Sequence, residues 1–222
     1  MKRFSNKKIN FIAAILLIIF IVIFSFGDFS KAKKASAAWY ATGGTWGYRK
    51  QITVDPEKVS GSSNLTDFPM LFKVTDPDLK HTAHGGKVGK IDGTDILFTS
   101  SDGSTKLSHE IEYYASTTGE IIAWVKVPTL YTAQQTPIYV YFGNSGASDQ
   151  QNVTGVWDSN FKGVWHMPNG TTLSAADSTS NANNGVATNA TAASGHIGGA
   201  ASFDGTDDEI LVTRNAGTDD IN

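Results

Sequence analysis

Beyond residue 38 the chain alternates apolar and polar residues over short segments. Apolar residues recur at every second position in six segments, at residues 51–54, 68–74, 96–98, 111–113, 121–127 and 138–142. Side chains of a strand point alternately to opposite faces, so this period of two predicts strands that bury one face. Gly, Asp, Asn, Ser and Pro separate the segments, and no stretch after residue 30 keeps a helical period over three turns. The pattern therefore predicts an all-β fold, an antiparallel β-sandwich or barrel.

Some of the predicted strands also carry apolar side chains on their second face, such as Ile122 beside Trp124. Either these strands are covered on both sides, or their aromatic rings form a flat platform for a sugar ring or a protein partner. The sequence leaves both interpretations open. The candidate ligand-contact residues are Trp46, Trp124, Tyr139, Tyr141 and Trp165.

The first 38 residues have the pattern of a secretory signal. A basic stretch precedes residues 11–26, in which only Ser25 is polar, and residues 35–37 (ASA) supply small side chains for cleavage. We expect cleavage between Ala37 and Ala38. Alternatively the segment stays attached as a membrane anchor, because 16 helical residues span about 24 Å of a hydrocarbon core of about 30 Å and flanking lysines reach the interface. In both cases we expect this N-terminal hydrophobic helix to direct the export of the rest of the chain.

Charge and cysteine content exclude several classes of function. The 222-residue chain has a net charge of −3, but the first 38 residues hold seven of its 18 basic and one of its 21 acidic residues. The remaining 11 basic and 20 acidic residues give the body a net charge of −9, which repels a phosphate backbone and argues against nucleic-acid binding. The chain has no cysteine, which excludes disulfides, thiolate zinc sites and a thiol nucleophile.

Five blocks follow one another in the middle of the chain. They are residues 67–71 (DFPML), 92–99 (DGTDILFT), 110–112 (EIE), 124–128 (WVKVP) and 138–144 (IYVYFGN). Together they resemble the bacterial domain of unknown function DUF2341, over roughly residues 46–147. The resemblance implies an extracellular β-sandwich, here residues 39–155, and no established activity. It also implies relatives among large surface proteins and among proteins of ExbB/TolQ-type biopolymer transport.

A second set of blocks occupies the last third of the chain. They are residues 164–167 (VWHM), 177–181 (DSTSN), 195–205 (GHIGGAASFDG) and 208–212 (DEILV). They resemble the opening of a concanavalin A-like, laminin-G-type jelly roll. Because such a fold needs roughly a dozen strands, we expect residues 156–222 to form only its first three or four, an incomplete second sandwich. A partial sheet leaves unpaired backbone groups, so we expect this segment to fold poorly by itself.

Candidate catalytic groups are few. Glu110 and Glu112 lie two apart on a predicted strand, about 7 Å from each other on one face. Paired carboxylates at such a separation can hydrolyse glycosides, but outward-pointing Glu is ordinary in an alternating strand. His81 and His84, near Asp76 and Asp78, could bind zinc, although they lie in a Gly- and Lys-rich loop. We therefore predict that the protein is not an enzyme.

Calcium is the better metal candidate. Hard cations bind oxygen ligands from Asp, Asn and backbone carbonyls in turns. The candidate ligands are Asp92, Asp95, Asp177 and Asp204. Asp-Gly pairs are equally typical of ordinary β-turns, and none of the candidates has EF-hand spacing.

These observations predict an exported, non-catalytic surface module. Its partner would be a polysaccharide or another cell-surface protein, and the only contact with the membrane would be the N-terminal segment. Two alternatives remain open. The modules could be structural spacers of a larger adhesin-like protein, or they could form an accessory domain of an envelope transport complex.

Overall fold

A computed structural model describes residues 33–34, 39–168 and 172–212. The expected hydrophobic helix and the expected cleavage site at Ala37 and Ala38 lie outside these residues, so both stay predictions. Within the described part of the chain, no helix is long and apolar enough to cross a membrane.

The structure is all-β. Its helices, where the chain is described, are four single 3-10 turns: η1 (Pro56–Lys58), η2 (Pro77–Leu79), η3 (Thr82–His84) and η4 (Val153–Gly155). Sheet A contains, in spatial order, β1 (Lys33–Lys34), β2 (Tyr48–Val54), β8 (Thr136–Phe142), β4 (Leu97–Thr99) and β5 (Lys106–Leu107). Sheet B contains β3 (Leu65–Thr75), β7 (Glu120–Leu130) and β6 (His109–Ala115). All neighbouring strands in both sheets pair antiparallel, which confirms the predicted fold class.

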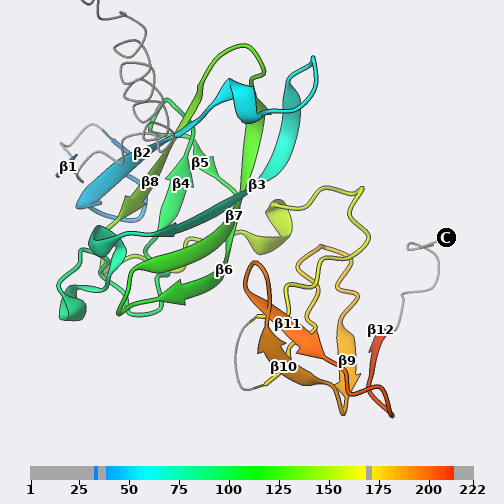
Figure 1. Cartoon of the computed structure of the whole chain (residues 1–222). Coiled ribbons are helices and arrows are strands. Elements are labelled where there is room, and N and C mark those ends of the chain that lie inside the picture. Colours follow the sequence, from blue (N-terminus) through cyan, green and yellow to red (C-terminus); the bar gives the residue numbers. More distant parts are fainter. Residues whose placement is uncertain (1–32, 35–38, 169–171, 213–222) are drawn as a thin grey trace, which may run out of the picture. The chain divides into compact units, whose positions relative to one another are not determined.

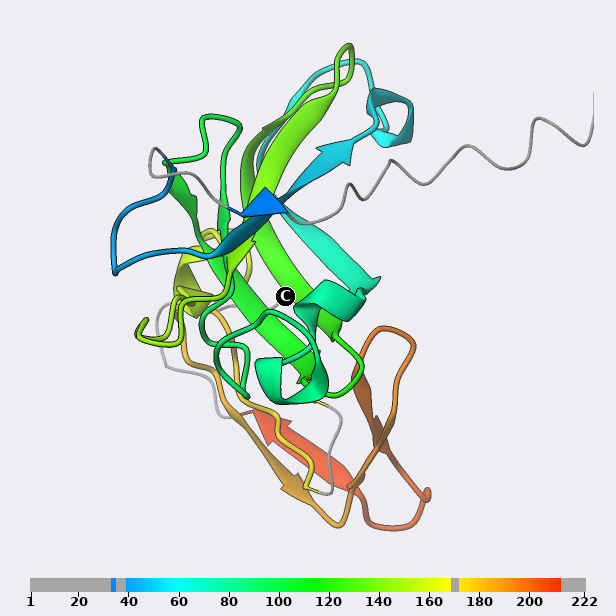
Figure 2. The same ribbon diagram turned by 90° about the vertical axis from the view of Figure 1, so that its left-hand side faces the viewer.

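The two sheets pack face to face as a sandwich (Figures 1 and 2). The core takes Phe72, Ala123 and Val125 from sheet B and Phe98 and Val140 from sheet A. These residues are the inward positions of the period-two pattern, so the alternation of apolar residues sets which face of each strand is buried. Phe68 departs from the pattern. It was expected on the inner face of its strand, but it lies near the start of β3 and is 39% exposed.

The outer face of sheet A is also covered. Tyr141 and Leu97 are fully buried there, together with Trp46, and Trp39, Tyr40 and Tyr139 pack against them. The Tyr141 hydroxyl accepts a hydrogen bond from Arg49 at 3.0 Å and donates one to the Gly103 carbonyl at 2.8 Å. The apolar side chains on the second face of β4 and β8 are therefore explained by packing.

A buried ion network joins β2 to the loop that follows β3. Lys50 is 5% exposed, and its Nζ lies 2.5 Å from Asp76 Oδ2 and 2.9 Å from Asp78 Oδ2. Lys87 lies 2.7 Å from the other oxygen of Asp78. Burial alone would raise the pKa of Asp78, but its hydrogen bonds with Lys87 and Lys50 outweigh burial and lower it to about 2.

His109 lies at the inner face of sheet B and is fully buried against the Phe98 ring, with 5.3 Å between the ring centroids. Its Nε2 lies 3.1 Å from the Ile96 carbonyl and its Nδ1 lies 3.4 Å from the Leu107 carbonyl. Burial disfavours the charged ring and lowers the pKa of His109 to about 4. The side chain is therefore neutral at pH 7.

This histidine makes the sandwich sensitive to acid. Between pH 6.5 and about 4 the unfolded chain binds a proton at His109 that the folded chain does not, so the free energy of unfolding falls as the pH falls. The cost from this residue is about 2 kcal/mol between pH 7 and pH 5. In urea titrations followed by tryptophan fluorescence, His109→Gln should lose about 2 kcal/mol less than the native chain over that interval. Equal losses in the two proteins would contradict the assignment.

The C-terminal part contributes four short strands in two antiparallel pairs. They are β9 (Gly185–Thr188) with β12 (Glu209–Val212), and β10 (Thr191–Ser194) with β11 (Gly199–Ser202). Val186 and Leu211 face each other across the first pair and are 65% and 59% exposed. Two-stranded sheets are marginally stable by themselves, so these pairs depend on their surroundings.

Candidate functional site

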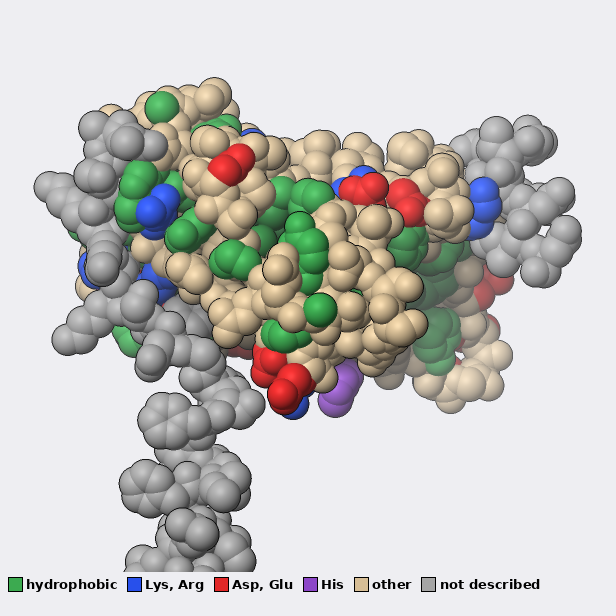
Figure 3. Space-filling view, turned by 90° about the horizontal axis from the view of Figure 1, so that it is seen from above, with side chains coloured by type: hydrophobic (Ala, Val, Ile, Leu, Met, Phe, Trp, Pro, Cys, Tyr) green, Lys and Arg blue, Asp and Glu red, His purple; other side chains and the backbone are tan. Residues whose placement is uncertain are grey.

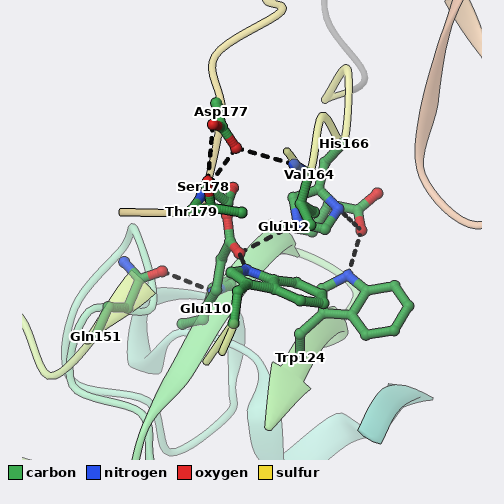
Figure 4. Close-up of polar contacts among 11 residues, drawn as sticks. Glu110, Glu112, Trp124, Gln151, Val164, His166, Asp177, Ser178 and Thr179 are labelled. Atoms are coloured by element: carbon green, nitrogen blue, oxygen red, sulfur yellow. Dashed lines mark hydrogen bonds and ion pairs between the residues drawn. The ribbon is translucent and has the colours of Figure 1, made fainter. Parts of the chain in front are cut away.

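The outer face of sheet B presents two carboxylates from β6. Glu110 is paired with Trp124 of β7, and the register between β6 and β7 then shifts by one residue between Ile111 and Tyr113. Glu112 is therefore the extra residue of a β-bulge, a feature that re-aims side chains at one face of a sheet. The bulge leaves both Glu110 and Glu112 on the outer face, where they meet His166 (Figure 4).

His166 lies between these two carboxylates. Its Nε2 is 3.1 Å from Glu110 Oε2, and its Nδ1 is 3.3 Å from Glu112 Oε2. The three side chains are 10%, 4% and 11% exposed for Glu110, Glu112 and His166. The imidazole also stacks on Trp124, with ring centroids 5.7 Å apart. We call Glu110, Glu112 and His166 the carboxylate–histidine triad.

The triad is charged at neutral pH. Burial would lower the pKa of His166, but hydrogen bonds to Glu110 and Glu112 outweigh it and raise that pKa to about 9. Burial would raise the pKa of Glu110 and of Glu112, and hydrogen bonds from His166 outweigh it and hold both pKa values below their ordinary value. An imidazolium thus bridges two carboxylates, and the triad has a net charge of −1.

Indole and hydroxyl donors complete the coordination of the carboxylates. Glu110 Oε2 accepts from Trp157 Nε1 at 3.0 Å, and Glu110 Oε1 accepts from the Ser178 hydroxyl at 2.5 Å. Glu112 Oε2 accepts from Trp124 Nε1 at 2.9 Å. His166, Trp157 and Ser178 belong to the segment of residues 157–183, of which the structure describes 157–168 and 172–183, so the triad binds this described part of the segment to sheet B.

Asp177 organises the same segment from within. Its Oδ1 accepts from the backbone N–H groups of Val164 and Thr179, both at 2.9 Å. Its Oδ2 accepts from the Thr179 hydroxyl and from the Asn183 N–H, both at 2.8 Å (Figure 4). These bonds hold Ser178 beside Glu110. Asp177 therefore has a structural role here, whether or not it also binds a cation.

This arrangement is unsuited to acid–base or nucleophilic chemistry. A general base needs a free lone pair, but both ring nitrogens of His166 point at carboxylates. The Ser178 hydroxyl donates to Glu110, and the lowered pKa of Glu110 makes its carboxylate a weak base for activating a nucleophile. Glu110 and Glu112 were expected to point outward, as in an ordinary alternating strand. Both lie on the outer face of sheet B, but that face is covered, and their side chains are only 10% and 4% exposed.

The predicted aromatic contact residues do not form one platform. Trp46 and Tyr141 are 3% and 0% exposed, beside half-buried Tyr139, on sheet A. Half-buried Trp124 lies on sheet B against Trp157 and His166. Trp165 is half-buried as well, and its Nε1 donates to the Asn183 carbonyl at 2.9 Å. The structure thus divides these residues between two covered faces.

The predicted calcium ligands are also dispersed. Asp92 accepts hydrogen bonds from the N–H and the hydroxyl of Thr94, as in an ordinary turn. Asp95 is fully buried and accepts four backbone N–H bonds, from residues that lie before it and far after it in sequence. The donors are Gly89, Lys90, Gly143 and Asn144, at 2.7–3.1 Å.

Asp204 is brought together with Asp207 and Asp208. One carboxylate oxygen from each lies within 4.8 Å of the others, on an exposed turn between β11 and β12. Asp204 Oδ1 also accepts from the Thr206 N–H at 2.9 Å, as in a turn. His81, in contrast, accepts a hydrogen bond from the Ala83 N–H, and its ring centroid lies 6.3 Å from that of His84.

Sequence reasoning missed His166, Trp157 and Ser178 as partners of Glu110. His166 and Ser178 lie within blocks that were used only for the jelly-roll resemblance. His166, a lone histidine between two apolar residues, could have indicated a positively charged partner for Glu110 and Glu112, because the body has few basic residues. The partner carboxylates could not be chosen from sequence, because 56 residues separate His166 from Glu110.

The fold is an all-β sandwich. The triad and its hydrogen-bond donors form buried polar contacts between sheet B and the C-terminal part. The family model described as Domain of unknown function (DUF2341) matches residues 92–209, more than half of the chain, and the chain belongs to this family. The match overlaps four of the five central blocks and continues to the first residue of β12. No match was found among curated proteins or among solved structures.

Proposed function

We propose that this protein is a non-catalytic, exported structural module that holds its C-terminal strands in one orientation relative to its sandwich. The carboxylate–histidine triad is the observation that supports this role. Its charged and polar atoms form ion pairs and hydrogen bonds between sheet B and residues 157–183. In a buried position such geometry stabilises one arrangement, because any other leaves a buried charge unpaired.

Export rests on the sequence of the first 38 residues, with either a cleaved signal or a retained anchor. On the face seen in Figure 3, acidic and basic side chains are scattered among polar ones and form no patch of a single sign.

A spacer within a larger surface protein would use such a module to set the direction of the neighbouring domain. The four strands β9 to β12 are, on this proposal, the first strands of a laminin-G-type jelly roll.

Distance measurements between spin labels test the proposed role. The chain has no cysteine, so Gln51→Cys on β2 and Thr188→Cys on β9, both at exposed positions, label cleanly. We expect one narrow distance distribution in the otherwise native chain. His166→Ala should broaden it, whereas His84→Ala, which removes an exposed histidine, should not. A broad distribution in the native background would refute the proposal.

A further inference from the structure

A small cavity lies beside the triad, between the outer face of sheet B and the turn that joins β10 to β11. Its volume is about 180 Å³. Lys73, Tyr113, Glu120 and Ile122 line it from sheet B, Ser194 lines it from the end of β10, and the turn lines its other side. The junction of two parts of a protein is a common place for a ligand site.

The turn is held close to the sheet by its own contacts. Lys73 Nζ donates to the Ile197 carbonyl at 3.2 Å. Gly198 approaches Glu112 so closely that a Cβ at this position would collide with Glu112 Oε1. These two contacts bring the turn up to the outer face of sheet B and so form the cavity.

Three polar groups of the lining have no hydrogen-bond partner among the described residues: the Tyr113 hydroxyl, the Glu120 carboxylate and the Ser194 hydroxyl. Lys73 uses one of its three donors on Ile197. Ile122, which is 3% exposed, adds an apolar surface, and the Tyr113 ring adds an aromatic one. The lining thus combines free donors, free acceptors and a small apolar surface.

We propose that this cavity binds a single sugar residue. A sugar ring presents several hydroxyls, which both donate and accept, around a compact apolar face. Glu120 would accept from hydroxyls, Lys73 and Ser194 would donate to them, and Ile122 and Tyr113 would contact the ring. Pockets for drug-sized molecules measure about 300–1,000 Å³, so this smaller cavity suits one ring of a glycan. The proposal goes beyond the structural role but rests on it, because the cavity exists only while the turn between β10 and β11 stays beside sheet B. The spin-label distances report on that role separately, so a failure of the role and a failure of sugar binding are distinguishable.

The test uses the full chain in a detergent without a sugar headgroup. Methyl glycosides of glucose, galactose, mannose and N-acetylglucosamine serve as probes in saturation-transfer and amide-shift NMR. At least one should bind with a dissociation constant in the millimolar range and shift the amides of Tyr113, Ile122 and residues 194–198. Glu120→Gln should weaken that binding about tenfold, because a hydrogen bond to a charged carboxylate becomes a weaker one to a neutral amide oxygen.

Two further variants separate the site from general effects. Glu57→Gln makes the same chemical change at an exposed position in η1 and should leave binding unchanged. Ser194→Phe should fill the cavity and abolish binding while the amide spectrum of sheets A and B stays native. The proposal is overturned if no glycoside binds, if bound glycosides shift only amides elsewhere, or if Glu120→Gln binds as the native chain does. If the cavity binds the polyamine spermidine but no glycoside, the lining recognises a cation and not sugar hydroxyls, and the proposal is overturned.

Discussion

Glu110→Ala is expected to release residues 157–183 from sheet B and to lower the free energy of unfolding by about 3–5 kcal/mol. The variant removes the acceptor of three buried donors, those of Trp157, His166 and Ser178. The imidazolium of His166 keeps only Glu112 as a counter-charge. Breaking one side of a buried ion pair is costly, because the group that remains has lost its water as well as its partner.

Urea titration with tryptophan fluorescence measures this effect well, because all five tryptophans lie after residue 38 and two of them, Trp124 and Trp157, pack at the site. Amide exchange should accelerate first in residues 157–183. Glu57→Ala, at an exposed position, is the matched control and should change the midpoint little. If Glu110→Ala and Glu57→Ala unfold at the same urea concentration, the triad does not stabilise the fold.

The triad also gives the contact a defined pH range. The pKa of His166 is raised from 6.5 to about 9, so its stabilising contribution is complete below pH 6.5 and is lost as the pH rises through 9. The pKa values of Glu110 and Glu112 are lowered, so their contribution is present above pH 4.5 and is lost as the pH falls below it. The contact is therefore strongest in mildly acidic to neutral solution.

Lys50→Met is the second change with a large expected effect, again a loss of about 3–5 kcal/mol in the free energy of unfolding. Methionine keeps most of the length of the side chain but leaves Asp76, which is 7% exposed, without its cation. Asp78 keeps Lys87, so the unpaired charge is concentrated on Asp76. The loss should be visible in the urea midpoint.

A double variant checks the cause. Adding Asp76→Asn to Lys50→Met removes the unpaired charge, so the double variant should recover part of the loss. Lys58→Met, at an exposed position in η1, is the control for the change of residue type. A double variant that is less stable than Lys50→Met would show that packing, and not charge, accounts for the loss.

The strands were predictable because their signal is local. All six segments with a period of two became strands, β2, β3, β4, β6, β7 and β8, since alternation of side chains and burial of one face are the same physical fact. The second apolar face, as at Ile122 and Trp124, left two interpretations open, a cover on that side or a platform for a ligand. The sequence could not say that residues 157–183 supply the cover.

The site was not predictable for reasons that are equally physical. Glutamates at alternate positions of a strand, such as Glu110 and Glu112, give the same sequence pattern whether they face solvent or are covered by a distant segment. The bulge at Glu112 has no glycine to mark it, and it depends on the register with β7. The role of Asp95 could not be predicted for a similar reason. Its sequence motif is that of a local turn, but two of its four hydrogen-bond donors, Gly143 and Asn144, come after β8 in the chain.

Asp95 also limits where the chain can change length. One carboxylate binds the N–H groups of two separate connections, residues 89–90 and residues 143–144, so an inserted or deleted residue in either would leave buried donors without an acceptor. The exposed residues 60–63 precede Asn64, whose side chain accepts from the Thr132 N–H, and bear no such constraint themselves. Natural variants of this module should therefore differ in length at residues 60–63 and keep the two connections bound by Asp95 unchanged.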